Sequence, residues 1–161
     1  MLFRSRSVVG IARETLEFAL RASEDTHPKE FMAVMRSTPT SELEFHGGTP
    51  AEEGEVVTDL MVLPGTKSGE AMASIREEMI PTGMGGVGTV HSHPSGSVRP
   101  SDEDLRTFSK KGERHVIVGY PYEEGCWQCY SREGEAVDLP VYDVEFDDPV
   151  LDDLEEFREG M

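Results

Sequence analysis

His91, His93 and Asp104 are residue types that bind metals, and they fall within one short segment, HSHPSGSVRPSDED. Side chains two residues apart on a strand point to the same side, so both imidazoles would face one point. Asp104 follows in the first turn of an expected helix and could supply a third ligand. Three protein ligands with one open position are typical of a catalytic zinc site, whereas structural sites are closed by four. The segment therefore predicts a zinc centre that activates water.

Each part of this segment also has an ordinary structural explanation. Pairs of histidines two residues apart are common, and most of them bind no metal. Ser101 followed three residues later by Asp104 matches the capping box at the start of a helix. Spacing alone leaves open whether Ser101 and Asp104 cap the helix, face the metal or do both.

The segment resembles the signature of the JAMM metallopeptidases, also called MPN-domain proteins. Their pattern is a distant Glu, then HxHP, seven residues, Ser, two residues and Asp. Here Pro94 follows His93, seven residues (94–100) precede Ser101, and Glu30 matches the distant Glu. The resemblance extends over about residues 11–143, and the compact form is similar to the archaeal members. It implies an α/β fold, a single MPN domain with a mixed central β-sheet flanked by helices, similar to the cytidine-deaminase architecture.

The resemblance also implies a role for each matching residue. His91, His93 and Asp104 would hold one Zn2+ ion. Glu30 would take the proton of the zinc-activated water and return it to the leaving lysine amine, and Ser101 would donate a hydrogen bond to the developing oxyanion. The implied enzyme is a zinc metalloprotease, more narrowly an isopeptidase that removes ubiquitin-like (SAMP-type) modifiers from lysines, as the archaeal desampylases do.

Two other functions stay open within the same family. The same hydrolysis could act on adducts of a sulfur-carrier protein, as in related bacterial members. Alternatively, the domain could be a non-catalytic MPN scaffold, although such scaffolds have usually lost the His or Asp positions that are intact here. Nucleobase deamination shares the fold, but the chain lacks the PCxxC and HxE segments that it normally uses.

Three expected elements would position these residues. Glu30 opens a short continuous apolar run, Phe31 to Met35, which is typical of a buried strand. Val87 to His93 is expected to form the strand that carries the histidines, and Pro94 ends it. Ser101 then starts a helix of about ten residues.

The rest of the chain predicts one sheet with a second helix. Apolar residues recur at helical spacing from about Ile11 to Ser23, and Leu105 and Phe108 would share one face of the later helix. Strands 42–46 and 55–63 are separated by turn residues and could form a hairpin. Residues 71–80 could form a strand or a helix by propensity, and a strand is favoured. The remaining expected strands are 115–120, 127–131 and 136–146.

Composition and length limit the organisation and the partners. The 161 residues, 37% of them hydrophobic, fit one domain over residues 1–146 followed by an acidic C-terminal tail, 147–161. A net charge of −17 with only four lysines argues against nucleic acid as a partner. No run approaches the roughly 20 apolar residues that cross a bilayer, and no secretory signal opens the chain, so a cytoplasmic location is expected. The sequence leaves the oligomeric state open.

The remaining chemistry-bearing residues are expected to be structural. Cys126 and Cys129 form a CxxC within a strand-like run, without the helix of a redox motif or the second pair of a zinc site. His115 begins an apolar strand and is expected to be partly buried. His27 and His46 lie near turns and are expected to be exposed.

Overall fold

The computed structural model describes residues 7–62 and 86–145. The expected strand 71–80 and the tail 147–161 lie outside the described residues. The elements are β1 (Val8–Ala12), α1 (Arg13–Thr26), β2 (Met32–Pro39), η1 (Thr40–Glu42), β3 (Glu44–His46), β4 (Glu55–Val62), β5 (Gly86–His93), α3 (Asp102–Phe108), β6 (Arg114–Gly119), β7 (Trp127–Ser131), β8 (Ala136–Val137) and β9 (Val141–Glu145). None of the helices in these ranges is long and apolar enough to span a bilayer.

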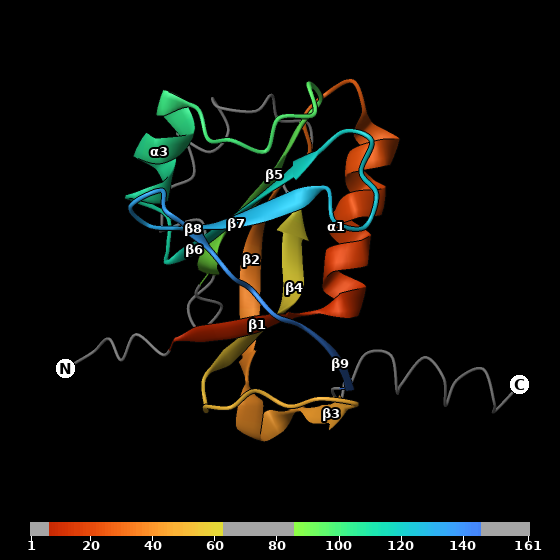
Figure 1. Cartoon of the computed structure of the whole chain (residues 1–161), viewed down its shortest axis with the longest axis vertical. Helices are drawn as coiled ribbons and strands as arrows, with labels where there is room; N and C mark the ends of the chain where they lie inside the picture. The colour runs from red at the N-terminus through yellow and green to blue at the C-terminus, as the bar shows by residue number, and fades with distance from the viewer. Residues whose placement is uncertain (1–6, 63–85, 146–161) are drawn as a thin grey trace, which may run out of the picture.

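The described strands form one nine-stranded mixed sheet in the order β3-β9-β1-β4-β2-β5-β6-β7-β8. The pairs β1–β4, β1–β9 and β5–β6 are parallel, and the other pairs are antiparallel. Helix α1 packs along the sheet, while α3 lies on the far side of it (Figure 1). The predicted fold class, a mixed sheet flanked by helices, is confirmed.

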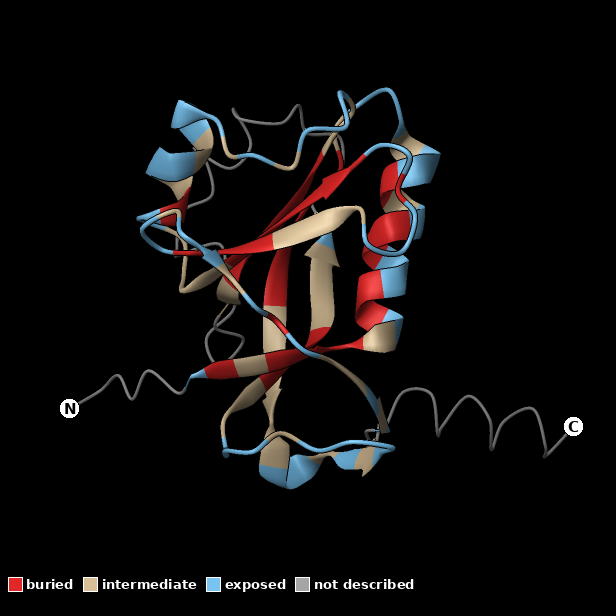
Figure 2. Cartoon of the chain, viewed as in Figure 1, coloured by how far each residue is buried: buried red, intermediate tan, exposed pale blue. Residues whose placement is uncertain are grey.

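The core lies between α1 and the middle of the sheet (Figure 2). Leu16 and Ala19 on the inner face of α1 are buried, as are Val90 on β5 and Val116 and Val118 on β6. Strands β5 and β6 each have a neighbour on both sides, so a backbone ladder runs along both edges of each strand. The strand that carries the two histidines therefore lies inside the sheet and not at its edge.

Residues 8–12 form a strand that the periodicity did not indicate. The helix begins at Arg13 instead of Ile11, because β1 runs to Ala12 between β4 and β9. Gly10 interrupts the apolar run and hides the strand pattern. Its missing side chain is required here, since a Cβ atom would lie 2.5 Å from the ring of Tyr142.

The expected hairpin between residues 42–46 and 55–63 is wrong. Strand β3 is short, pairs antiparallel with β9, and follows a 3-10 turn, whereas β4 lies between β1 and β2. The side chains of β3 are exposed or half-buried, so its own pattern carried little information about its partner. Pairing of β4 in the centre of the sheet buries Val56 and Val57 completely, which a hairpin at the edge would not do.

Two other boundaries differ from expectation. The expected strand 136–146 is split into β8 and β9, which lie near opposite ends of the sheet. Pro140 separates them and cannot donate to a ladder, although its carbonyl accepts from Ile11 N–H at 2.9 Å. Helix α3 has seven residues rather than about ten, and Phe108 is fully buried while Leu105 is 37% exposed. The two side chains therefore do not share one buried face.

Candidate metal centre

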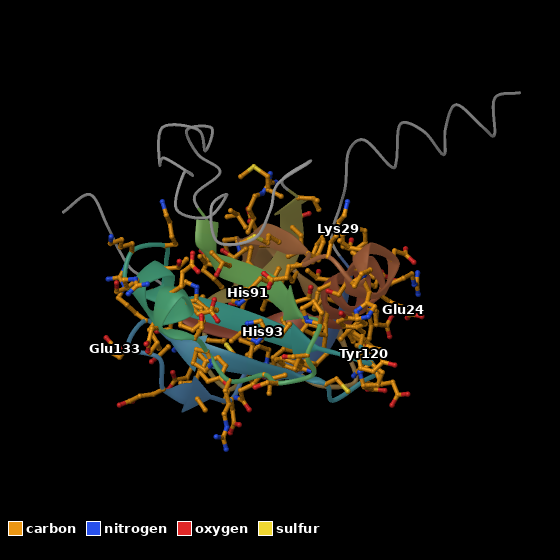
Figure 3. The ribbon with its side chains drawn as sticks, turned by 90° about the horizontal axis from the view of Figure 1, so that it is seen from above. Glu24, Lys29, His91, His93, Tyr120 and Glu133 are labelled. Carbon is orange, nitrogen blue, oxygen red and sulfur yellow. The ribbon has the colours of Figure 1, made fainter. Side chains whose placement is uncertain are left out.

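Strand β5 carries His91 and His93 in the middle of the sheet. Its residues pair with β2 on one side and β6 on the other, with His91 opposite both Met32 and Ile117. Alternation along the strand turns both imidazoles to one side, and Figure 3 shows the two side chains next to each other. His91 is only 5% exposed.

The ligand atoms of three predicted residues converge on one point. His91 Nε2 lies 3.1 Å from His93 Nε2 and 3.1 Å from Asp104 Oδ1, and His93 Nε2 lies 3.1 Å from Asp104 Oδ2. Two ligands that bind zinc tetrahedrally at 2.0–2.1 Å are themselves separated by about 3.3 Å. The donor set and its spacing therefore fit a zinc ion. A second cluster of potential ligands among the described residues, Glu44, His46 and Glu145, is exposed on β3 and β9, which agrees with the expected exposure of His46.

Hydrogen bonds around His93 fix its orientation. Its Nδ1–H donates to the carbonyl of Ser97 at 2.7 Å, which leaves Nε2 facing the converging point, 3.1 Å from Asp104 Oδ2. The hydrogen bond with Asp104 raises the pKa of His93 above its ordinary value, although burial lowers it. Burial raises the pKa of the Asp104 carboxyl, but hydrogen bonds from His91 and His93 outweigh burial and hold that pKa well below its ordinary range. Asp104 is therefore ionised and ready to bind a cation.

The capping box at the start of α3 is formed, and its carboxylate is the one that faces the two histidines. Ser101 Oγ accepts from Asp104 N–H at 3.1 Å, and Asp104 Oδ2 accepts from Ser101 N–H at 2.9 Å. The same Oδ2 atom faces His93, so Asp104 caps the helix and offers a ligand at once. Accepting a bond leaves the O–H proton of Ser101 able to donate to a substrate.

All five predicted site residues line one open cleft of about 330 Å³: Glu30, His91, His93, Ser101 and Asp104. Glu30 reaches the cleft from the segment before β2, which is antiparallel to β5. Met32, on the same strand, adds a buried apolar side chain, and Glu103 adds a third carboxylate from α3. The fold brings the five residues together, and their individual roles remain predictions.

His115 was expected to be partly buried, and it is completely buried. Its Nε2–H is shared between the carbonyls of Phe108 and Gly112, at 3.1 and 3.0 Å, and its Nδ1 accepts from Thr89 Oγ1 at 2.7 Å. Burial lowers the pKa of His115 to about 4, so it is neutral at pH 7. The position of His115 at the start of an apolar strand indicated burial, but the sequence does not show its hydrogen-bond partners.

The other residues with potential chemistry are structural in the described fold. Cys126 and Cys129 are free thiols, and burial raises the pKa of the Cys129 thiol to about 11, which makes it a poor nucleophile. His27 is exposed, as expected, but its Nδ1 also lies 2.7 Å from the Tyr122 hydroxyl. The phenol of Tyr130 donates to the carbonyl of Val98 and so ties the loop after His93 to β7.

Comparison with known proteins agrees with this geometry. The family of prokaryotic homologs of the JAB domain matches residues 12–130. A protein of Haloferax volcanii described as a probable metalloprotease is 43% identical over 148 residues, which cover 92% of this chain and 88% of the relative.

Two solved structures are similar in sequence and in fold. A JAB1/MPN domain protein from Archaeoglobus fulgidus is 39% identical with a TM-score of 0.58, covering 82% of this chain and 97% of that one. A structure described as a metalloprotease-like zinc site in the proteasome and signalosome is 36% identical with a TM-score of 0.58, covering 84% of this chain and 98% of that one.

Proposed function

Because the chain belongs to the prokaryotic JAB-domain family and is a JAMM/MPN metallopeptidase-like protein, we propose that it is a zinc-dependent isopeptidase that removes ubiquitin-like modifiers from lysines. The observation that carries the proposal is the convergence of two imidazoles and one carboxylate in a cleft that Glu30 also lines. The description of the Haloferax volcanii relative as a probable metalloprotease supports a hydrolase.

His91, His93 and Asp104 would hold the ion through Nε2, Nε2 and a carboxylate oxygen. A bound zinc ion with an open position would supply a water acidified to a pKa of about 7 and would polarise the scissile carbonyl. The surroundings of these residues favour metal binding, because the Nδ1 hydrogen bond orients His93 with Nε2 towards the site and Asp104 is ionised.

Glu30 is our candidate for the group that moves the proton. It would accept a proton from the attacking water as the new C–O bond forms, and return it to the lysine nitrogen as the C–N bond breaks. Its place in the same cleft as the metal ligands supports this role. General acid–base catalysis of this kind contributes about 100- to 10,000-fold in rate.

Ser101 is our candidate for stabilising the developing oxyanion. Its oxygen accepts a backbone hydrogen bond from Asp104, which fixes the side chain and leaves its proton to donate. Such a donor is worth about 100- to 1,000-fold in rate.

The charge of the cleft supports a lysine conjugate as the substrate. Glu30, Glu103 and Asp104 line it, and no Lys or Arg is among its lining residues in the part of the chain that the structure describes. A lysine amine leaves as a cation, so a carboxylate-lined cleft favours its formation. The narrow Gly-Gly tail typical of ubiquitin-like modifiers is small enough to approach such a site in extended form.

The proposal is tested with the purified chain, a modifier joined through Gly-Gly to a lysine, and a cysteine adduct of a sulfur-carrier protein. We expect cleavage of the lysine conjugate, loss of cleavage on treatment with a chelator, and recovery on addition of Zn2+. Cleavage of the cysteine adduct alone would favour the sulfur-carrier function. Stoichiometric zinc with no hydrolysis of either substrate would refute the enzyme and favour a scaffold.

Variants of Glu30 and Glu103 test whether Glu30 in particular, and not any carboxylate of the cleft, transfers the proton. Glu30→Ala and Glu30→Gln should abolish turnover and keep zinc, while Glu103→Gln, which removes a neighbouring carboxylate of the same cleft, should change kcat only a few-fold. Full activity or loss of zinc in the Glu30 variants would contradict the role of Glu30.

A further inference from the structure

Ser92, between the two histidines, closes the ladder of β2 and β5 in an unusual way. Its N–H donates to the Phe31 carbonyl at 2.9 Å, as expected for two residues directly opposite in an antiparallel pair. The return bond, however, runs from Phe31 N–H to the Ser92 hydroxyl oxygen at 2.8 Å instead of to the Ser92 carbonyl. A side chain therefore replaces one backbone acceptor at the end of this ladder.

This hydrogen bond is close to the candidate site, because Glu30 directly precedes Phe31 in the sequence. The three residues before Glu30, His27 to Lys29, are exposed, while Phe31 and Ser92 are buried at 5% and 0% exposure. Glu30 thus lies where an exposed turn enters the sheet, and the amide held by Ser92 is the first one after it. The peptide between Glu30 and Phe31 therefore donates its N–H to the Ser92 hydroxyl.

We infer that Ser92 is a positioning residue that holds Glu30 in register with His91 and His93 through the Phe31 amide. The inference rests on the proposed function for its catalytic consequence. Strand β5 would then supply both histidines. Through the residue between them, it would also place the carboxylate that precedes the neighbouring strand β2. Because proton transfer needs an approach of about 2.6–3.2 Å, a small displacement of Glu30 would slow the reaction strongly.

The chain offers a matched control for this inference. Ser131 is also a buried strand serine, 8% exposed, whose hydroxyl oxygen accepts from the amides of Glu133 and Glu135. It lies on β7 and is not among the residues that line the cleft. Ser131→Ala removes the same kind of bond, so it reports the general effect of losing a buried serine acceptor.

The experiment compares Ser92→Ala, Ser92→Thr and Ser131→Ala in the full chain. For Ser92→Ala we expect zinc content and KM to stay within twofold and kcat to fall about 10- to 100-fold. Ser92→Thr keeps the hydroxyl and should restore kcat to within a few-fold, and Ser131→Ala should leave it unchanged. If Ser92→Ala does not fold, Ser92→Cys, whose sulfur is a weak acceptor of similar size, should show the same fall in kcat.

Nuclear magnetic resonance gives readouts that do not require turnover. Ser92→Ala should speed hydrogen exchange of the Phe31 amide at least about 10-fold and leave the Val90 amide unchanged, since only the former loses its acceptor. Addition of Zn2+ should shift the 13C signal of the Glu30 carboxyl in the wild type and in Ser92→Thr, and much less in Ser92→Ala.

The outcomes distinguish this inference from the proposed function. Unchanged kcat, or an unchanged zinc-induced shift of Glu30 in Ser92→Ala, would overturn it, as would loss of zinc, which would mean that Ser92 acts on the histidines. If the wild type cleaves no substrate, the proposed function fails. The hydrogen exchange of the Phe31 amide and the 13C shift of the Glu30 carboxyl then still decide whether Ser92 positions that carboxylate.

Discussion

The candidate metal centre is built from two regions that are held in very different ways. Strand β5 presents His91 and His93 from the middle of the sheet, hydrogen-bonded to a strand on each side. Helix α3 presents Asp104 from only seven residues, of which Phe108 alone is buried. The strand half is fixed by its backbone, whereas the helix half depends on a few side chains.

Those side chains gather at the far end of α3. Phe108 stacks on His115, with ring centroids 4.3 Å apart and 12° between the planes, and lies 6.0 Å from the ring of Tyr130. His115 also donates to the Phe108 carbonyl, so ring stacking and a buried hydrogen bond hold the same residue. This anchor, Phe108, follows Asp104 by four positions, just over one turn of helix. A short, largely exposed helix can therefore hold a candidate ligand in place when buried side chains fix one end of the helix.

The largest expected effect is loss of the metal when a ligand from either region is removed. His91→Ala and Asp104→Ala should each weaken zinc binding by more than about 100-fold, since each removes a ligand rather than a residue behind it. Zinc content after dialysis measures this. Equal losses would mean that the two regions contribute alike, and stoichiometric zinc in either variant would refute that ligand.

Removal of the Phe108 side chain should destabilise α3, which carries Asp104, more than β5, which carries the two histidines. Phe108→Ala removes a fully buried ring and should lower the free energy of unfolding by about 3–5 kcal/mol. Urea titration of the metal-free protein measures the change, and zinc affinity should fall with it. Phe18→Ala is the matched control, because Phe18 on α1 is 51% exposed and should matter little. Similar losses for both variants would contradict the anchor.

The pH dependence of stability tests the His115 anchor. The unfolded protein binds a proton at His115 near pH 6.5, whereas the pKa of the folded state is about 4. The unfolded state therefore binds more protons in this window, and stability falls as the pH drops from about 6.5 to 4. The span corresponds to about 3 kcal/mol at most, at 1.36 kcal/mol per pKa unit.

The difference in unfolding free energy between wild type and His115→Gln isolates this contribution from that of His93, whose raised pKa acts in the opposite direction. The excess in unfolding free energy of the wild type over His115→Gln should decrease as the pH is lowered from about 6.5 to 4. A difference that stays constant from pH 7 to pH 4 would show that His115 does not titrate as its burial requires.

The smallest expected effect concerns the cap at the start of α3. Ser101→Ala should lower the free energy of unfolding by about 1 kcal/mol, while Ser101→Asp keeps a capping acceptor and most of the stability. Aspartate cannot donate to an oxyanion, so Ser101→Asp should nevertheless lose activity. Retained activity in Ser101→Asp would show that Ser101 is needed only as a helix cap and not as a donor to the oxyanion.

Much of the site was predictable because its residues act over short stretches of sequence. Alternation on a strand puts His91 and His93 on one side, and the capping pattern puts Ser101 and Asp104 together, whatever the rest of the fold does. The amphipathic pattern of α1 and the apolar run of β2 were recognisable for the same reason. The family signature added Glu30, whose link to the other four residues no local pattern contains.

From the sequence alone the candidate site residues could be named, together with the side of a strand or the turn of a helix that each occupies. Only the tertiary structure decided which strands pair. The partner of β3, the separation of β8 from β9, the strand at Val8–Ala12 and the bond from Phe31 to Ser92 all follow from that pairing. The physical reason is that side-chain direction follows from local backbone geometry, whereas pairing depends on the total burial and hydrogen bonding that distant segments achieve together.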